Sequence, residues 1–254
     1  MNDTVDTKSL TDAPNFDGKV ALVTGGGKGL GRACTIGLAA AGAKVVAVAR
    51  TESDLQEVQS CNPNNISYWV QDVLDNELYS KIEEMEQLDI LVGCAGANKP
   101  QPISEITLDT IDWLIDLNIR AIFRASQSAA KIMLKQGAGS IINMSSQMGH
   151  IGAPNRTLYC TTKHAVEGLT KALAVELAPK GIRVNAVAPT FIDTPFTRPM
   201  FEDKAFKETV ENNIALGHIG TVEDVAAAVL FLASPAAAMI TGESLKVDGG
   251  WTAW

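Results

Sequence analysis

The sequence predicts an α/β protein with a single domain: a doubly wound parallel sheet of about seven strands, with helices on both faces. Along the 254 residues, short β-branched apolar segments alternate with longer segments whose apolar residues recur at helical spacing. The strand candidates are nearly continuous apolar runs, as expected for strands covered on both sides. No linker or repeat divides the chain, so the alternation favours right-handed βαβ units in one sheet.

The strand candidates follow one another at regular intervals. KVALVT at residues 19–24 is closed by a glycine run, and KVVAVA at 44–49 follows a helix that stops at Gly42. Five more apolar runs are bounded by polar or glycine residues and lie at 66–70, 89–93, 140–144, 183–188 and 244–247.

Amphipathic segments between these strands predict the helices. They lie near residues 29–41, 75–86, 108–136, 159–178 and 222–233. The polar, acidic segment 1–15 lacks such periodicity and is expected to be a flexible tail, which leaves 16–254 as the domain.

Composition excludes several classes of protein. The chain has 21 Lys and Arg against 29 Asp and Glu, a net charge of −8, and no basic block, which disfavours nucleic-acid binding. The longest apolar run, 226–240, is broken by Ser234-Pro235, so no membrane span is expected. The four cysteines are scattered and the N-terminus lacks a signal-peptide pattern, which predicts a cytoplasmic protein with reduced thiols and no metal site.

The first strand leads into a glycine-rich turn, TGGGKGLG at residues 24–31. Glycines let the backbone approach a pyrophosphate, and the N–H groups at the start of the following helix attract its charge. The GxGxxG spacing is absent, and simple tight-turn geometry explains such a run equally well. The turn alone therefore does not identify a nucleotide site.

Further motifs along the chain indicate what this turn binds. From about residue 17 onward the chain resembles the short-chain dehydrogenase/reductase family, in which the turn reads TGxxxGxG. The other matching blocks keep the family's order and are Asp72-Val73, Cys94-Ala95-Gly96, Asn118, Ser146 with Tyr159-x-x-x-Lys163 thirteen residues later, and 185–189. The resemblance implies a Rossmann-type fold and hydride transfer with a nicotinamide cofactor.

The end of the second strand bears on which cofactor is used. An acidic residue there usually holds the adenosine ribose of NAD, but this chain has Ala49 followed by Arg50 and Thr51. Arg50 and Lys28 could bind a 2′-phosphate, as in the NADP-dependent carbonyl and xylulose reductases of the family. We therefore expect NADP(H) to be preferred over NAD(H), while a solvated position at a helix start is the other explanation for Arg50.

The resemblance also implies the remaining cofactor contacts. Asp72 and the Val73 backbone would bind adenine, although Asp72 could instead cap the helix that begins near Asn76. Beyond the sixth strand, the Ile192 backbone and the Thr194 hydroxyl would hold the carboxamide. The full expected set is Gly25, Gly27, Lys28, Gly29, Leu30, Gly31, Arg50, Thr51, Asp72, Val73, Ala95, Gly96, Tyr159, Lys163, Pro189, Ile192 and Thr194.

Two positions depart from the family pattern. Thr190 follows Pro189 where glycine is common, which bears on the geometry of this loop. Cys94 replaces the usual asparagine of an Asn-Ala-Gly block and is interpreted as a small packed residue.

The expected catalytic set is Asn118, Ser146, Tyr159 and Lys163. Tyr159 and Lys163 are four residues apart and so project from one helix face. A tyrosine has a pKa near 10, and a nearby ammonium together with an oxidised nicotinamide would lower it. The resemblance implies that Tyr159 is the acid or base, that Ser146 binds the substrate oxygen, and that Asn118 disturbs its helix and holds a water of a proton relay.

The segment 195–217 varies most among family members and is expected to form a helical lid over the substrate. The candidate pocket residues are Ser146, Gln147, His150, Asn155, Tyr159, Phe196, Met200 and Phe201, with His150 as an ordinary loop histidine as the alternative. The family also implies a homotetramer formed through residues 108–136, 159–178 and the C-terminal strand. Because exposed tryptophans at the end of the chain are unfavourable, we expect Trp251 and Trp254 to be buried at a subunit interface.

Three functions are therefore open. The first is an NADP(H)-dependent reductase or dehydrogenase acting on a small carbonyl, sugar or sugar acid. The second is a 3-oxoacyl thioester reductase, which the acidic net charge disfavours because its carrier protein is acidic. The third is a non-catalytic NADP-binding regulator, which the intact catalytic set disfavours.

Overall fold

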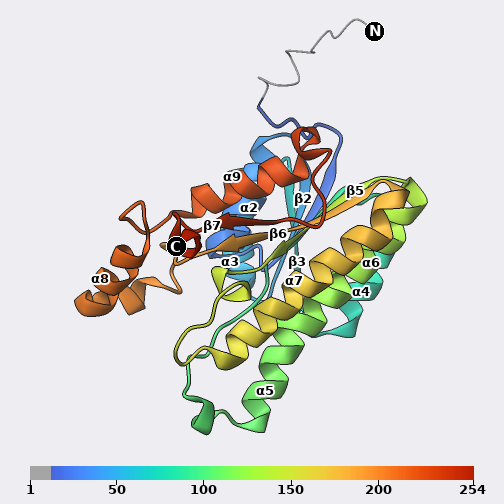
Figure 1. Ribbon diagram of the computed structural model, residues 1–254. Helices are drawn as coiled ribbons and strands as arrows, with labels where there is room; N and C mark the ends of the chain where they lie inside the picture. Colours follow the sequence, from blue (N-terminus) through green and yellow to red (C-terminus); the bar gives the residue numbers. More distant parts are fainter. Residues whose placement is uncertain (1–12) are drawn as a thin grey trace, which may run out of the picture.

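The computed structural model describes residues 13–254, so most of the expected tail at 1–15 lies outside the described residues. Seven parallel strands form one sheet in the order β3-β2-β1-β4-β5-β6-β7 (Figure 1). This confirms the doubly wound α/β class. The strands are β1 (Val20–Thr24), β2 (Lys44–Ala49), β3 (Ile66–Val70), β4 (Ile90–Gly93), β5 (Gly139–Met144), β6 (Ile182–Pro189) and β7 (Ser244–Val247).

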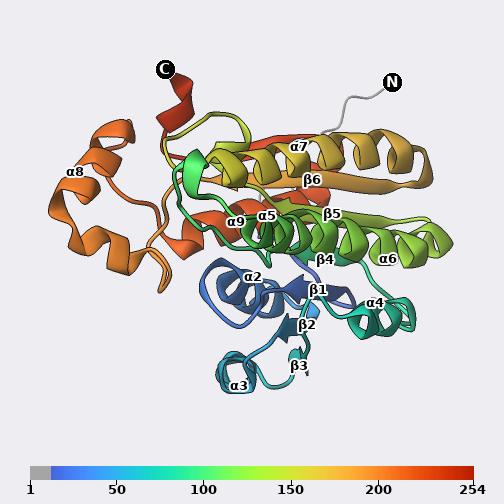
Figure 2. The ribbon, with the colours of Figure 1, turned by 90° about the horizontal axis from the view of Figure 1, so that it is seen from below.

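Helices cover both faces of the sheet (Figures 1 and 2). One face carries α2 (Gly29–Ala40), α3 (Glu52–Cys61) and α9 (Val222–Ala233). The other carries α4 (Asn76–Glu83), α6 (Ala121–Gln136) and α7 (Thr157–Leu177), and α5 (Leu108–Ile115) packs against α7. A further helix, α8 (Lys204–Asn213), stands away from the sheet at one end of the molecule (Figure 1).

Two hydrophobic cores result, one on each side of the sheet. Leu38 of α2 and Val229 of α9 pack together on the first side, and Leu78 of α4 and Met133 of α6 pack on the second, all with no exposed surface. Burying such a side chain contributes about 1.5–3 kcal/mol. Phe16 is only 2% exposed and packs into the first core, so the chain joins the globular structure there.

The structure departs from the expected helices in two places. The long helix expected at 108–136 is interrupted by one π-helical turn, η2 (Asp116–Arg120), between α5 and α6. Helix α3 was not among the predicted helix ranges, because its sequence is polar and only Leu55 and Val58 are buried, although the alternative explanation for Arg50 implied a helix starting there. Among residues 13–254, no helix combines the length and apolar character required to cross a membrane.

The sheet order places the functional end of the molecule. β1 lies between β2 and β4, so the direction in which strands are added reverses beside β1. In open α/β sheets, ligands bind in the crevice beyond the carboxyl ends of the strands at this reversal.

Candidate active site

The glycine-rich turn after β1 has no room for side chains. A Cβ on Gly31 would lie 2.1 Å from the Gly25 carbonyl oxygen, and one on Gly25 would lie 3.0 Å from the Ala95 backbone. Gly25 and Gly29 also have φ values of 70° and 53°, which L residues rarely adopt. The turn is therefore a bare backbone cradle against the start of α2, and it fits the pyrophosphate of a dinucleotide.

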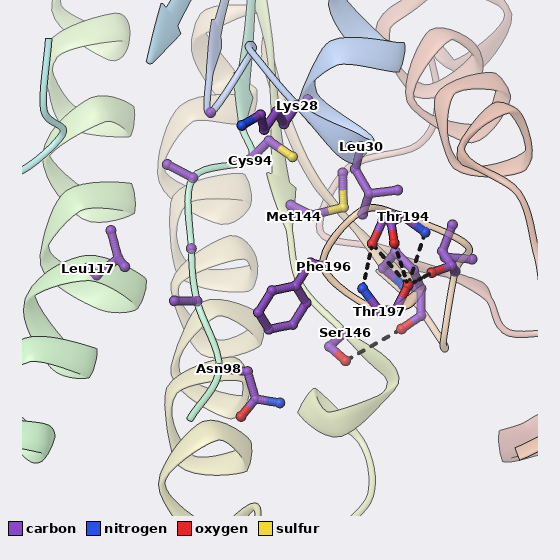
Figure 3. A pocket seen from close by; sticks show the side chains of 18 of the residues that line it. Lys28, Leu30, Cys94, Asn98, Leu117, Met144, Ser146, Thr194, Phe196 and Thr197 are labelled. Carbon is purple, nitrogen blue, oxygen red and sulfur yellow. Dashed lines mark hydrogen bonds between the residues drawn. The ribbon is translucent and has the colours of Figure 1, made fainter. Parts of the chain in front are cut away.

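A cavity of about 740 Å³ extends from this cradle across the carboxyl ends of the strands (Figure 3). All seventeen expected cofactor residues line it, from Gly25 to Thr194. The expected pocket residues Gln147, Phe196 and Met200 also line it, together with Ser146, Tyr159 and Lys163. One continuous cavity thus joins the glycine cradle to the Tyr-Lys pair.

Both cations at the β2 end of the cavity are paired with carboxylates. Lys28 Nζ lies 3.1 Å from Asp54, and Arg50 lies 3.6 Å from Asp72. Both cationic side chains are largely exposed. Asp72 also accepts a hydrogen bond from the Leu74 N–H at 3.0 Å. The N-cap position of α4 belongs to Asp75, so the alternative role of Asp72 as its cap is wrong.

Three expected catalytic side chains meet at one wall of the cavity. Lys163 Nζ donates to the Met144 carbonyl at 2.8 Å and lies 5.6 Å from the centre of the Tyr159 ring. Ser146 lies two residues beyond the end of β5, and its Oγ accepts a hydrogen bond from the Met148 N–H at 3.2 Å. The strand β5 and the helix α7 thus supply the two sides of this arrangement.

The pKa values of Tyr159 and Lys163 are governed by burial. Burial raises the pKa of Tyr159 to about 12, against the opposing effects of a Ser146 hydrogen bond and the Arg156 guanidinium. Burial likewise lowers the pKa of Lys163 to about 8, against the nearby Cys94 and Glu167. In the protein alone, desolvation outweighs the lowering of the tyrosine pKa that the sequence suggested.

Asn118 lies behind the cavity wall and is not among its lining residues. Its side chain is 0% exposed, accepts from the Ala97 N–H at 2.9 Å, and donates to the Ala97 carbonyl at 2.8 Å and to Thr162 at 3.1 Å. It occupies the π-helical turn η2, which agrees with the expected disturbance of the helix. Asn118 therefore ties the loop after β4 to α7.

Three expected pocket residues lie outside the lining. His150 Nε2 is 2.9 Å from Ser244 Oγ and 3.3 Å from Glu167, so the histidine joins α7 to β7. Asn155 is exposed on a loop with φ of 58°. Phe201 packs against Phe191, with ring centres 6.4 Å apart. The contacts of His150 join segments that are far apart in the sequence, which the local sequence does not specify.

The structure adds lining residues that the motifs did not indicate. Asn98, Arg156 and Thr190 face the cavity, and each has a buried polar atom with no hydrogen-bond partner. For Arg156 a signal was available, because it lies three residues before Tyr159 and therefore on the same side of α7. Cys94 also lines the cavity, and burial raises the pKa of its thiol to about 11, so it is an inert thiol.

Known proteins share this arrangement along nearly the whole chain. The family model described as enoyl-(acyl carrier protein) reductase matches residues 25–252. L-xylulose reductase of Mus musculus is 41% identical over 238 residues, which cover 93% of this chain and 97% of that protein. The 3-oxoacyl-[acyl-carrier-protein] reductase FabG of Vibrio harveyi is 37% identical over 241 residues, 93% of this chain and 98% of the relative.

A solved structure gives the same result. The gluconate 5-dehydrogenase of Burkholderia cenocepacia, in complex with NADP and tartrate, has a TM-score of 0.90 at 33% identity, covering 94% of this chain and 97% of the other. With the glycine cradle and the Tyr-Lys pair in one cavity, the chain is an NAD(P)-dependent oxidoreductase that belongs to the short-chain dehydrogenase/reductase family.

Proposed function

We propose that this protein catalyses the NADP(H)-dependent interconversion of a small hydroxylated ketone and its secondary alcohol, with Ser146, Tyr159 and Lys163 as the catalytic residues and Asn118, the fourth member of the expected set, as a positioning residue behind them. One observation carries the proposal. Ser146, Tyr159 and Lys163 line the same cavity as the glycine cradle, so a carbonyl beside Tyr159 is in reach of a dinucleotide bound along the cradle.

In the reducing direction, a bound NADPH supplies the hydride that forms the new C–H bond. The Tyr159 hydroxyl donates its proton to the carbonyl oxygen as the C=O π bond breaks, which yields the O–H of the alcohol. The Ser146 hydroxyl donates a hydrogen bond to the same oxygen and stabilises the charge that develops on it. Oxidation runs these steps in reverse, with Tyr159 as the base.

The pKa values suit these roles. A Tyr159 pKa of about 12 keeps the phenol protonated at neutral pH, ready to donate. A Lys163 pKa of about 8 leaves its ammonium mostly charged at neutral pH. The ammonium would compensate the phenolate left after proton donation. It would also hold the ribose hydroxyls of the cofactor.

NADP(H) is the expected cofactor because the β2 end of the cavity holds Lys28 and Arg50 and has Ala49 in place of an acid. Their partners Asp54 and Asp72 are weak competitors, since exposed ion pairs contribute only about 0–1 kcal/mol. A 2′-phosphate can therefore take over both cations. The NADP in the Burkholderia cenocepacia structure supports this choice over NAD(H).

The substrate class follows from the relatives and the lining. A ketose reductase and a sugar-acid dehydrogenase both resemble the chain, and the cavity beside Tyr159 carries amide and guanidinium groups suited to hydroxylated molecules. We propose that segment 195–217 covers this end of the cavity, since Pro195, Phe196 and Met200 already line it.

A 3-oxoacyl thioester reductase is the second candidate, because the Vibrio harveyi relative covers 93% of the chain. A net charge of −8 disfavours docking of an acidic carrier protein. Following NADPH absorbance with ketoses, keto sugar acids, a dicarbonyl and an acetoacetyl thioester distinguishes the two. Turnover of the thioester alone would contradict the proposal, and turnover of none would indicate a non-catalytic NADP-binding regulator.

Replacing the proposed acid tests the chemistry directly. Tyr159→Phe should lower kcat by at least about 100-fold, the effect of losing a general acid, while the Kd for NADPH changes little. Tyr68→Phe on β3, outside the cavity lining, is the matched control and should keep full activity. Near-normal turnover by Tyr159→Phe would exclude the assigned role.

We also propose a cytoplasmic homotetramer. The exposed apolar residues Leu108, Phe123 and Val175 lie on α5, α6 and α7, the helices expected at the interfaces, and Val175 is 79% exposed. Trp254 is 80% exposed at the chain end. All four cysteines are free thiols, which suits a reducing compartment. Light scattering should give four times the 26.9 kDa chain mass, and a monomer would contradict this assembly.

A further inference from the structure

The end of the cavity beside Tyr159 contains polar groups that hydride transfer does not require. Gln147 is 1% exposed, lines the cavity, and has no hydrogen-bond partner for either atom of its amide. Asn98 Oδ1 is buried and unpartnered in the same lining, and Asn98 appears below Phe196 in Figure 3. Buried polar groups are costly without partners, so these amides indicate hydrogen bonds made to a ligand.

Arg156 is the charged member of this group. It occupies the N-cap position of α7, three residues before Tyr159, and its Nη1 is buried without a hydrogen-bond partner. Among the residues that the structure describes, 13–254, no carboxylate lies within ion-pair distance of it. The first turn of α7 also contains no acidic residue.

The other cations of the cavity do have protein partners. Lys28 and Arg50 are paired with carboxylates, and Lys163 donates to a backbone carbonyl. Arg156 therefore presents positive charge that the described residues leave uncompensated. Burial lowers its pKa, which reflects the cost of holding this charge away from water. Retaining such a charge beside the reacting group makes sense if an anion arrives with the ligand.

We infer that Arg156 binds a carboxylate of the substrate, with the Gln147 and Asn98 amides on its hydroxyl groups, so that the ketone reduced here is a keto sugar acid and not a neutral ketose. This inference rests on the proposed function and specifies its substrate. A guanidinium matches a carboxylate in geometry and neutralises its single charge. A phosphate ester carries nearly two charges, for which the described residues at this end of the cavity offer, besides the carbonyl-bonded Lys163, one cation with an unpartnered nitrogen, Arg156, among neutral amides.

Matched substrate pairs test the inference. 5-Keto-D-gluconate and L-sorbose differ only in a terminal carboxylate against a hydroxymethyl group, and acetoacetate and 4-hydroxy-2-butanone form a second such pair. For the wild-type enzyme, kcat/KM should be at least about tenfold higher for the carboxylate member, the gain expected from one charge-assisted hydrogen bond. A preference for the neutral member in both pairs, or for a phosphorylated ketose over both, would overturn it.

Removing the charge should remove the preference. In Arg156→Gln, the ratio of kcat/KM for 5-keto-D-gluconate to that for L-sorbose should fall by about 10- to 100-fold. Arg156→Lys should recover part of it, because the charge stays and the fork geometry is lost. Arg32→Gln is the matched control, since Arg32 pairs with Glu57 and does not line the cavity. Its ratio should equal that of the wild type.

A binding measurement separates specificity from activity. In complexes with NADPH, calorimetry on the wild-type enzyme should give D-gluconate a Kd at least about tenfold lower than D-glucitol, whether or not the variants fold. Equal Kd values, or an unchanged substrate ratio in a folded Arg156→Gln, would refute the inference and leave the proposed function standing. If none of the four ketones supports NADPH oxidation, that result would instead refute the proposed function.

Discussion

Asn118→Leu is the most informative single substitution, because it acts on the loop after β4 without touching the lining of the cavity. The Asn118 amide makes both backbone hydrogen bonds to Ala97, at 2.9 and 2.8 Å, from a position with no exposed surface. Leucine has the same number of side-chain heavy atoms, branched at the same carbon, and no polar atoms. The substitution therefore leaves the N–H and the carbonyl of Ala97 without their partner.

The geometry sets the expected size of the effect. Each orphaned buried group costs about 1–3 kcal/mol, so two should lower the free energy of unfolding by about 2–6 kcal/mol. Because Ala95, Gly96 and Ala97 line the cavity, release of this loop should also weaken NADPH binding. The structure thus predicts a combined loss of stability and of cofactor affinity from a residue behind the cavity wall.

Denaturant unfolding and NADPH fluorescence titration measure the two effects. Asn143→Leu is the matched control, since Asn143 is equally buried but bonds only to the hydroxyls of Thr170 and Ser126. That variant should lose stability and keep the Kd for NADPH within about threefold, which is less than 1 kcal/mol. If Asn118→Leu loses less than about 1 kcal/mol of stability, or if both variants lose NADPH affinity equally, the reasoning fails.

Three further predictions concern the cradle, the pH dependence and the cofactor. Gly31→Ala places a Cβ 2.1 Å from the Gly25 carbonyl oxygen, so it should lower the free energy of unfolding by about 1–3 kcal/mol and remove most of the NADPH affinity. Gly168→Ala on α7 is the control, because its Cβ meets nothing within 4 Å and should not destabilise the fold. The pKa of Lys163 is lowered to about 8, so above pH 8 the folded state binds fewer protons than the unfolded state, and this group's contribution to stability rises from pH 8 toward 10 by up to about 3 kcal/mol. Denaturant unfolding at several pH values should show this rise for the wild type and not for Lys163→Met. If the stability of both proteins changes with pH in the same way, the prediction is wrong. Arg50→Gln should raise the KM for NADPH about 10-fold or more and leave that for NADH within about 3-fold, and equal changes for both cofactors would exclude a 2′-phosphate contact.

The sheet was predictable from the sequence because its strands are buried on both faces and therefore read as unbroken apolar runs. β2 and β7 begin and end where the sequence analysis placed them, and α9 likewise matches its predicted range. Helix α3 escaped prediction because only Leu55 and Val58 contact the core, which leaves too few apolar residues to show a helical period. A disturbance of the helix at Asn118 was expected only through the family resemblance, since the sequence there continues a helical pattern, and the π-helical form of η2 was not expected.

The candidate site was predictable where its residues follow a strand or share a helix turn, as do Ser146 and the pair Tyr159 and Lys163. It was less predictable where the neighbour comes from a distant segment. His150 contacts Ser244, which is 94 residues away, and this contact takes it out of the cavity lining. The raised pKa of Tyr159 likewise results from burial, which spacing along a helix does not reveal.

The cations of the cavity explain why selectivity should differ between its two ends. At the cofactor end, Lys28 and Arg50 already have carboxylate partners, so a 2′-phosphate exchanges one set of exposed ion pairs for another and its net gain is reduced. At the substrate end, Arg156 has no such partner among the described residues, and a carboxylate relieves a cost that the folded protein already carries. Each variant loses one charge-assisted contact. Arg156→Gln should therefore reduce the preference for the carboxylate substrate by a larger factor than Arg50→Gln reduces the preference for NADPH over NADH. The reverse order would mean that solvent reaching the cavity already compensates the Arg156 charge.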